Sequence, residues 1–277
     1  MISTLLPKLR ATILASSAAL LLSSCELLEF SPNDVRVTAT EQDLTHKNLA
    51  RLAAQPKPTG GDTLRFVFTT DSQRYYDELD PLVSSINQQR GVAFVLLGGD
   101  VSDFGLRREM SWVQEKLNGL HAPYLTVVGN HDLVGNGRTA YQKLFGPLNY
   151  TFTYGDTRFI LVDTNGREYA FNGQAPNVPW LQQQLADTLE VRRQVTVCHV
   201  PPFNEDFDPA LKENFARTLA QAPRLVFNLS GHIDKFGESE PYDDGVTYIS
   251  GYSVQQRHYL LLTLWGKTHY KLEAIAY

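Results

Sequence analysis

The sequence lacks several features that would have indicated a function class directly. It has no clustered Lys/Arg stripe and a formal net charge of −5, which argues against long nucleic acids as partners. It contains neither a G-x-x-x-x-G-K-[ST] phosphate loop nor a G-x-S-x-G nucleophile turn. Two common sequence signals of phosphate binding and of a serine nucleophile are therefore missing.

Cysteine is also scarce, and its two positions have different explanations. Lys8 and Arg10 precede an apolar run over 11–22, which is too short to span a bilayer and is typical of a secretory signal. The ending Leu22-Ser23-Ser24-Cys25 resembles a bacterial lipobox, so we expect 1–24 to be a signal peptide and Cys25 to carry lipid. The alternative is a plain signal peptide with a chance cysteine. The predicted location is the bacterial cell envelope, lipid-anchored and facing the periplasm or the cell exterior.

After removal of the signal peptide, the chain would contain the lipidated Cys25 and one further cysteine, Cys198, which lies in the apolar run 195–198. With Cys25 lipidated, no intramolecular disulfide can form, and Cys198 is interpreted as a buried, inert thiol. A domain of this size can be held together by burial of its core alone.

The remaining chain divides into a tether and a domain. Residues 25–62 contain Pro56, Pro58, Gly60 and Gly61 and one possible short helix over 44–54, which is typical of a stiff spacer. We expect the folded domain to span 63–277.

Apolar, β-branched runs alternate with amphipathic segments in the predicted domain. Strands are predicted over 64–68, 93–97, 124–128, 159–162, 195–197 and 225–229, and helices over 75–89, 106–117 and 179–189. Later segments, 149–154, 246–250 and 259–274, are predicted to be strands joined directly to one another. This order indicates an α/β domain with mixed sheets covered by helices.

Polar side chains follow five of these strands. The strand ends read Asp71-Ser72-Gln73, Gly99-Asp100-Val101-Ser102-Asp103, Gly129-Asn130-His131-Asp132, Cys198-His199 and Gly231-His232-Ile233-Asp234. Ligands of α/β folds bind outside the carboxyl ends of strands, so these side chains are expected to meet at one edge. Any single strand end could be an ordinary turn or helix cap. Five together favour divalent metals, and a pair of metals can hold a phosphoryl group and activate water for attack.

The series Gly99-Asp100, Gly129-Asn130-His131-Asp132, His199 and Gly231-His232 resembles the calcineurin-like metallophosphoesterase family over about 64–277. The resemblance implies an αββα fold, a two-sheet β-sandwich flanked by helices. It implies that Asp100 bridges two metals and that Asn130, His199 and His232 complete one site, with Asp71 in the other. His131 would contact the phosphate and protonate the leaving oxygen, and Asp103 stands where some relatives place an acid that orients this histidine.

Two positions depart from the family pattern. Gln73 replaces the histidine of D-x-H, and Asp234 replaces the second histidine of G-H-x-H. Both histidines serve the same metal in the family. Oxygen donors suit Mg²⁺, Ca²⁺ or Mn²⁺, whereas imidazole suits Zn²⁺ and iron. The sequence predicts a harder ion (Mn, Mg or Ca) at Asp71/Gln73/Asp100/Asp234, and Zn, Mn or Fe at Asp100/Asn130/His199/His232.

The predicted activity is hydrolysis of phosphomonoesters or phosphodiesters by metal-hydroxide attack, with a small molecule or a phospholipid headgroup as substrate and the membrane contacted through lipid on Cys25. The pattern leaves the oligomeric state open. The alternative is a catalytically weak or inactive surface lipoprotein that binds a metal or a phosphorylated ligand at the altered Gln73/Asp234 site.

Overall fold

The computed structural model describes residues 31, 33–55 and 63–277, and its main compact unit spans Val35–Tyr277. The predicted signal peptide and Cys25 lie outside the described residues. Within the described ranges, no helix combines the length and apolar character needed to cross a membrane.

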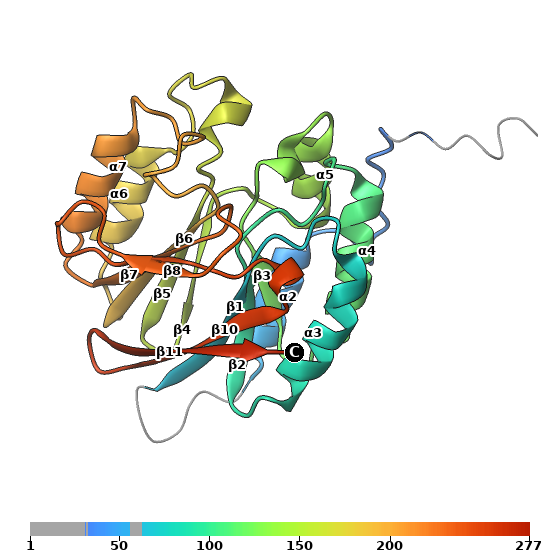
Figure 1. Ribbon diagram of the computed structural model, residues 1–277, viewed down its shortest axis with the longest axis horizontal. Helices are drawn as coiled ribbons and strands as arrows, with labels where there is room; N and C mark the ends of the chain where they lie inside the picture. Colours follow the sequence, from blue (N-terminus) through green and yellow to red (C-terminus); the bar gives the residue numbers. More distant parts are fainter. Residues whose placement is uncertain (1–30, 32, 56–62) are drawn as a thin grey trace, which may run out of the picture. The chain divides into compact units, whose positions relative to one another are not determined.

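Two mixed β-sheets form the centre of the compact unit (Figure 1). The first has the strand order β11-β10-β1-β2-β3, and the second β4-β5-β6-β7-β9-β8. The strands of the first sheet are β1 (Leu64–Thr69), β2 (Val92–Leu97), β3 (Tyr124–Thr126), β10 (His258–Trp265) and β11 (His269–Ala276). Those of the second are β4 (Tyr150–Tyr154), β5 (Thr157–Val162), β6 (Arg193–Cys198), β7 (Leu225–Ser230), β8 (Gly237–Ser239) and β9 (Tyr248–Ser250).

Helices cover the outer faces of both sheets, with α3, α4 and α5 on one side and α6 and α7 on the other (Figure 1). The α-helices are α2 (Leu44–Ala53), α3 (Leu79–Gln88), α4 (Arg107–Leu117), α5 (Gly137–Leu144), α6 (Val178–Ala186) and α7 (Lys212–Ala220). Short 3₁₀ helices are η2 (Tyr76–Glu78), η3 (His131–Leu133), η4 (Gly166–Tyr169) and η5 (Val254–Gln256). The predicted α/β class, two sheets flanked by helices, is confirmed.

The alternation of side chains along each strand separates the core into layers. In β1, Phe66 and Phe68 pack between the two sheets, whereas Val67 packs under the helices of the first sheet. In β5, Phe159 faces the other sheet and Ile160 faces α6 and α7. Because both faces of these strands are buried, both faces carry apolar side chains. The sequence therefore shows continuous apolar runs there.

Helix α2 belongs to the folded domain. Its Leu44 and Leu52 are 5% and 3% exposed and lie in the cores on the two sides of the first sheet. The segment 35–55, assigned to the tether from its sequence, is therefore part of the compact unit, and the structured boundary lies near Val35 rather than at 63. The Pro/Gly-rich stretch 56–62 lies outside the described residues.

The predicted elements lie close to their predicted positions, with differences at their ends. The strand predicted over 124–128 ends at Thr126, and the helix over 75–89 begins with the 3₁₀ turn η2. The helix predicted over 179–189 ends at Ala186. Helices α5 and α7 were not predicted.

Parallel pairing brings the functional strand ends together. Strands β1 and β2 run parallel in one sheet, and β6 and β7 run parallel in the other. The loops that follow them contact one another directly, since the Nδ1 atom of His199, after β6, lies 2.7 Å from the carbonyl oxygen of Gly98, after β2.

Candidate metal centre

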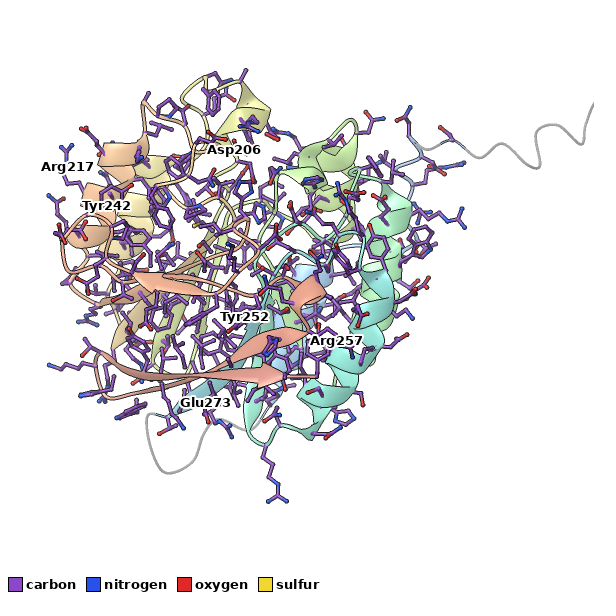
Figure 2. All side chains as sticks on the ribbon, in the orientation of Figure 1. Asp206, Arg217, Tyr242, Tyr252, Arg257 and Glu273 are labelled. Atoms are coloured by element: carbon purple, nitrogen blue, oxygen red, sulfur yellow. The ribbon has the colours of Figure 1, made fainter. Side chains whose placement is uncertain are left out.

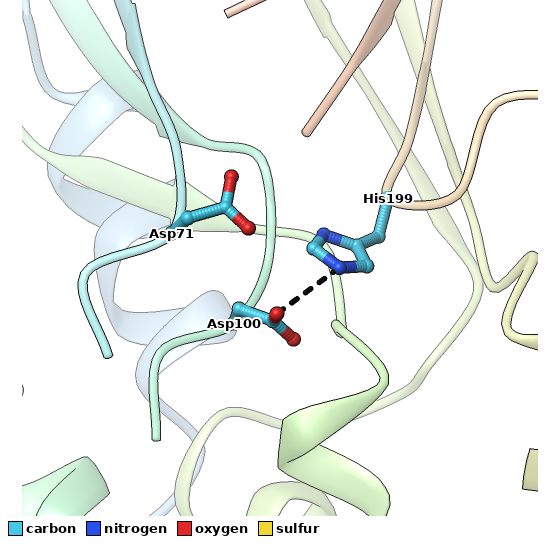
Figure 3. A group of neighbouring side chains, drawn as sticks. All are labelled: Asp71, Asp100 and His199. Atoms are coloured by element: carbon cyan, nitrogen blue, oxygen red, sulfur yellow. Dashed lines mark ion pairs between the residues drawn. The ribbon is translucent and has the colours of Figure 1, made fainter. Parts of the chain in front are cut away.

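Asp71, Asp100 and His199 meet at the edge where the two sheets come together. Each offers one ligand atom, and these atoms all lie within 4.8 Å of one another. Figure 3 shows Asp71 and Asp100 entering from the loops after β1 and β2, and His199 entering from the opposite side at the end of β6. All three are buried, with 2%, 2% and 0% exposure. Such a group of buried donors matches what a divalent cation requires.

Asn130 joins this cluster to His232. Its Oδ1 atom lies 2.9 Å from Nε2 of His199 and 3.1 Å from Nδ1 of His232. Nε2 of His199 also lies 3.3 Å from Oδ2 of Asp100. The structure therefore brings together all four residues predicted for the mixed nitrogen and oxygen site.

The altered site is not brought together in the same way, since Asp234 is not among the residues whose ligand atoms lie within 4.8 Å of one another. The backbone N–H of Gln73 donates to the carbonyl oxygen of Asp100 at 3.1 Å, while its Oε1 atom is buried and has no hydrogen-bond partner among the described residues. Asp234 is exposed, and its carbonyl oxygen accepts from the N–H of Ser253 at 3.5 Å. A buried amide oxygen without a partner is what an oxygen-rich cation site would contain.

The backbone is strained at four predicted ligands. Asp71, Asp100, His232 and Asp234 have φ angles of 52°, 53°, 67° and 63°. A non-glycine residue in the left-handed region costs on the order of 1–3 kcal/mol, and such residues concentrate at functional sites. Residues away from this edge, among them Asp43, Ala170 and Arg257, share this conformation, so the strain agrees with a functional site here but does not identify it.

Two glycines allow the loops to approach this closely. A Cβ atom on Gly129 would lie 2.1 Å from both the backbone nitrogen and Oδ1 of Asp100. At Gly99, where φ is +96°, a Cβ would lie 2.5 Å from Nδ1 of His199. Larger residues would push the donors apart.

Asp132 has a structural role that the sequence analysis did not assign. This buried carboxylate accepts hydrogen bonds from the N–H of Val101, the N–H and hydroxyl of Ser102 and the N–H of Gly129, at 2.8–3.2 Å. It therefore ties the loop after β2 to the loop after β3, and with them Asp100 to Asn130. Burial raises the pKa of Asp132 to about 6.

His131 lies beside the donors without joining them. Its backbone N–H donates to Oδ1 of Asp100 at 2.9 Å, and its ring Nδ1 donates to the carbonyl oxygen of Asp103 at 2.7 Å. The Asp103 carboxylate lies farther from Nδ1, at 3.5 Å, and accepts from Nε of Arg74 at 2.8 Å. Both groups of Asp103 thus face Nδ1 of His131, the carbonyl at hydrogen-bond distance and the carboxylate, which also accepts from Arg74, at ion-pair distance.

Burial and neighbouring charges shift the pKa values of the ionisable groups at the centre. Burial raises the pKa of Asp71 to about 8. Burial would lower the pKa of His199, but the adjacent carboxylates of Asp100 and Asp71 outweigh it and raise that pKa to about 10. Burial and the charge of His199 lower the pKa of His232 to about 4, which keeps its imidazole neutral. A divalent cation would take the place of the protons on Asp71 and His199.

The residues present fit a metal centre. Carboxylates, neutral imidazole and amide oxygens are ligands for divalent ions, and Asp100 is placed to serve both donor sets. Cys198 is buried and is not needed as a ligand, since its Sγ contacts the side chain of Asn228.

Comparison with known families matches residues 64–236 to calcineurin-like phosphoesterases. A probable cyclic nucleotide phosphodiesterase of Rhodopseudomonas palustris is 26% identical over 170 residues, which cover 51% of this chain and 58% of that protein. The match thus extends over little more than half of the curated relative.

Solved structures show the same fold. A dimetal phosphatase from Danio rerio aligns with a TM-score of 0.59 and 15% identity, covering 76% of this chain and 98% of that one. A purple acid phosphatase from yellow lupin seeds aligns with a TM-score of 0.63 and 12% identity, covering 80% of this chain and 53% of that one.

Proposed function

Because this chain belongs to the calcineurin-like phosphoesterase family, and is thereby a metal-dependent phosphoric ester hydrolase, we propose that it is an exported, lipid-anchored member with two unlike metal sites. The family uses a dinuclear divalent-metal centre. The observation that carries the proposal is the convergence of Asp71, Asp100 and His199 within 4.8 Å, with Asn130 linking His199 to His232.

The two proposed sites differ in donor chemistry and share Asp100. Asn130, His199 and His232 supply an amide oxygen and two imidazoles to one site, which suits Zn²⁺, Mn²⁺ or iron. Asp71, Gln73 and Asp234 supply only oxygens to the other, which suits Mg²⁺, Mn²⁺ or Ca²⁺. The buried, unpartnered Oε1 of Gln73 supports the second assignment.

Bound divalent ions would neutralise charge on the phosphoryl oxygens and activate water. The chain's own contribution is positioning and proton transfer. Nδ1 of His131 is held by the carbonyl of Asp103, and its ring is 30% exposed beside Asp100. His131 is thereby placed to give a proton to the leaving oxygen as the ester bond breaks.

The first substrate class to test is a small phosphodiester. The relative from Rhodopseudomonas palustris, described as a probable cyclic nucleotide phosphodiesterase, supports this choice. A phosphomonoester and a phospholipid headgroup are the other two classes, since the fold itself sets only the reaction type.

The experiment combines elemental analysis with assays of the full chain purified without chelator. A chromogenic phosphodiester, a cyclic nucleotide and a chromogenic phosphomonoester are each assayed with Mg²⁺, Mn²⁺, Ca²⁺ and Zn²⁺ added singly. We expect close to two metals per chain and turnover that EDTA abolishes. Preparations with no metal and no turnover under any ion would contradict the hydrolase.

A second candidate is a surface protein that binds a metal or a phosphorylated ligand without turnover. The exposure of Asp234 at the altered site favours it. Calorimetric binding of a non-hydrolysable phosphodiester, together with absence of hydrolysis at every metal concentration, would select this alternative.

Export and anchoring rest on the sequence motif alone. We expect Cys25 to be labelled by a fatty-acid probe in cells and the protein to fractionate with membranes. Cys25→Ser should release it from membranes while leaving the phosphoesterase activity of the domain intact. Membrane association that persists in this variant would contradict lipid anchoring.

A further inference from the structure

The two ring nitrogens of His232 face different neighbours. Nδ1 points to the donor cluster, 3.1 Å from Oδ1 of Asn130. Nε2 lies 3.4 Å from Oδ2 of Asp206, a side chain that is only 9% exposed. Both neighbours are hydrogen-bond acceptors, but the Asp206 carboxylate is charged, whereas Oδ1 of Asn130 is a neutral amide oxygen that also faces Nε2 of His199. The charged acceptor favours a proton on Nε2, which leaves the lone pair of Nδ1 for a ligand.

The other two histidines of the site are oriented by carbonyl groups. Nδ1 of His199 faces the carbonyl oxygen of Gly98 at 2.7 Å, which leaves Nε2 directed at Asn130 and Asp100. Nδ1 of His131 faces the carbonyl oxygen of Asp103, also at 2.7 Å. Each histidine thus has one nitrogen that faces an acceptor, and for His232 the acceptor on the side away from Asn130 is a carboxylate rather than a carbonyl group.

Asp206 is itself held firmly. Its other carboxylate oxygen forms an ion pair with the guanidinium of Arg167, and its carbonyl accepts from the Arg167 N–H at 3.1 Å. Its own N–H donates to Oδ1 of Asn204 at 2.9 Å. The next residue, Phe207, is buried in the core under α6 and α7. Figure 2 labels Asp206 in the loop region above α6 and β6.

We propose that Asp206 is a positioning residue, which fixes the proton of His232 on Nε2 so that Nδ1 faces the metal donors, and that Arg167 fixes Asp206. The inference rests on the metal centre proposed above. Carboxylates in this position orient metal-binding histidines and make them more basic ligands, and their loss typically weakens metal binding about 10–100-fold. An Arg167–Asp206–His232 chain would therefore connect η4 to the mixed nitrogen and oxygen site.

The first test reads the proton position in the metal-free protein. The full chain is labelled with ¹⁵N-histidine, treated with EDTA, and the ring of His232 is assigned by comparison with His232→Ala. Long-range ¹H–¹⁵N spectra distinguish the two neutral tautomers. We expect the Nε2–H form in the wild type, and the Nδ1–H form there would overturn the proposal without reference to any variant.

The second test separates the acceptor from its charge. Asp206→Leu has a similar shape and no acceptor, so the Nε2–H preference should be lost and Co²⁺ affinity at this site should fall about 10–100-fold. Asp206→Asn keeps a neutral acceptor, so it should retain the tautomer while binding Co²⁺ more weakly than the wild type. Arg167→Gln should weaken binding less than Asp206→Leu, because it leaves the carboxylate in place.

Glu205→Ala is the matched control. Glu205 has the same charge, is adjacent in sequence and is 90% exposed, and it contacts Arg167 only at 4.0 Å. It should leave tautomer and Co²⁺ affinity unchanged. Wild-type tautomer and affinity in Asp206→Leu would overturn the proposal. A wild type that shows the Nε2–H tautomer and binds Co²⁺ but hydrolyses no ester would contradict the proposed function and leave the role of Asp206 supported.

Discussion

At the scale of single residues, His131 is separated from the metal donors although it lies next to Asn130 in sequence. Its Nδ1 atom lies 2.7 Å from the Asp103 carbonyl oxygen, and its proposed role is proton transfer rather than metal binding. We expect His131→Ala to lower kcat about 10²–10⁴-fold, with most of the loss on esters that have poor leaving groups. Steady-state kinetics on two esters of different leaving-group pKa, with metal content measured in parallel, check this.

The matched control for this prediction is His121→Ala. His121 is exposed, and its N–H bonds to the side chain of Asn87, away from the centre. The activity of the His121→Ala variant should equal that of the wild type. Full activity of His131→Ala on a poor leaving group would show that another group supplies the proton, and loss of metal from that variant would show that His131 is a ligand.

The sequence was sufficient to predict the residues that follow strand ends. Asp100, Asn130 and His199 lie in the loops that begin at the ends of apolar strands, where side chains can reach the sheet edge. Asp206 could not be found in this way. It lies in an irregular loop, seven residues beyond His199, and its function depends on the fold of η4 and on a contact with His232. Asp132 is part of the Gly129-Asn130-His131-Asp132 motif, but its role in joining two loops could not be predicted, because its four hydrogen-bond donors come from both of them.

At the scale of elements, the loop after β3 must pass very close to the loop after β2. Gly129→Ala places a methyl group 2.1 Å from the backbone and carboxylate of Asp100, so Asp100 has to move. We expect a loss of about 1–3 kcal/mol in the free energy of unfolding, the usual cost of overpacking, and at least a tenfold loss of metal affinity. Chemical denaturation and chelator competition measure the two effects separately.

Gly237→Ala serves as the control for this substitution. Gly237 lies in the exposed strand β8, and an added Cβ would meet no atom within 4 Å. It should leave both stability and metal affinity unchanged within experimental error. Wild-type metal affinity in Gly129→Ala would mean that the Asp100 loop is not constrained as the structure indicates.

Helix α2 gives a second prediction at this scale. Leu52 is 3% exposed and packs in the core between the sheets, so Leu52→Ala should cost about 2–5 kcal/mol of unfolding free energy. Leu189→Ala, at a position that is 79% exposed, should change it by no more than about 0.5 kcal/mol. Equal changes in the free energy of unfolding for the two variants would show that 35–55 is a tether and not part of the folded domain.

Sequence patterns located the strands more reliably than the short helices. Strands β1, β2, β5, β6 and β7 are apolar on both faces and appear as continuous runs. Helices α5 and α7 have only eight and nine residues, so each presents only about two turns of apolar pattern. The tether prediction failed at α2 for a related reason, because burial of a short helix depends on contacts with β3 and β4 that are distant in sequence.

At the scale of the whole molecule, the centre is built where two sheets meet. Asp71 and Asp100 follow strands of one sheet, and His199 and His232 follow strands of the other. A metal bound between them would link the two halves of the domain. Ligands that bind only the folded state stabilise it, by about 2.7 kcal/mol at a free concentration of 100 Kd. Removal of the metal should therefore lower the thermal unfolding temperature by several degrees.

This stabilisation should depend on pH with a definite sign. Burial raises the pKa of Asp71 to about 8, and the carboxylates around His199, working against burial, raise its pKa to about 10, so both groups hold protons at pH 7 in the metal-free protein. Metal binding must displace those protons, hence affinity should rise, and the stabilising effect with it, as the pH increases from 6 to 8. Calorimetric titration of Mn²⁺ in two buffers of different ionisation enthalpy should report net proton release at pH 7. Asp71→Asn, which removes one titrating carboxyl group, should release fewer protons. Equal heats in the two buffers would show that metal binding releases no net proton. The donors would then already be deprotonated in the metal-free protein, which contradicts the raised pKa values of Asp71 and His199.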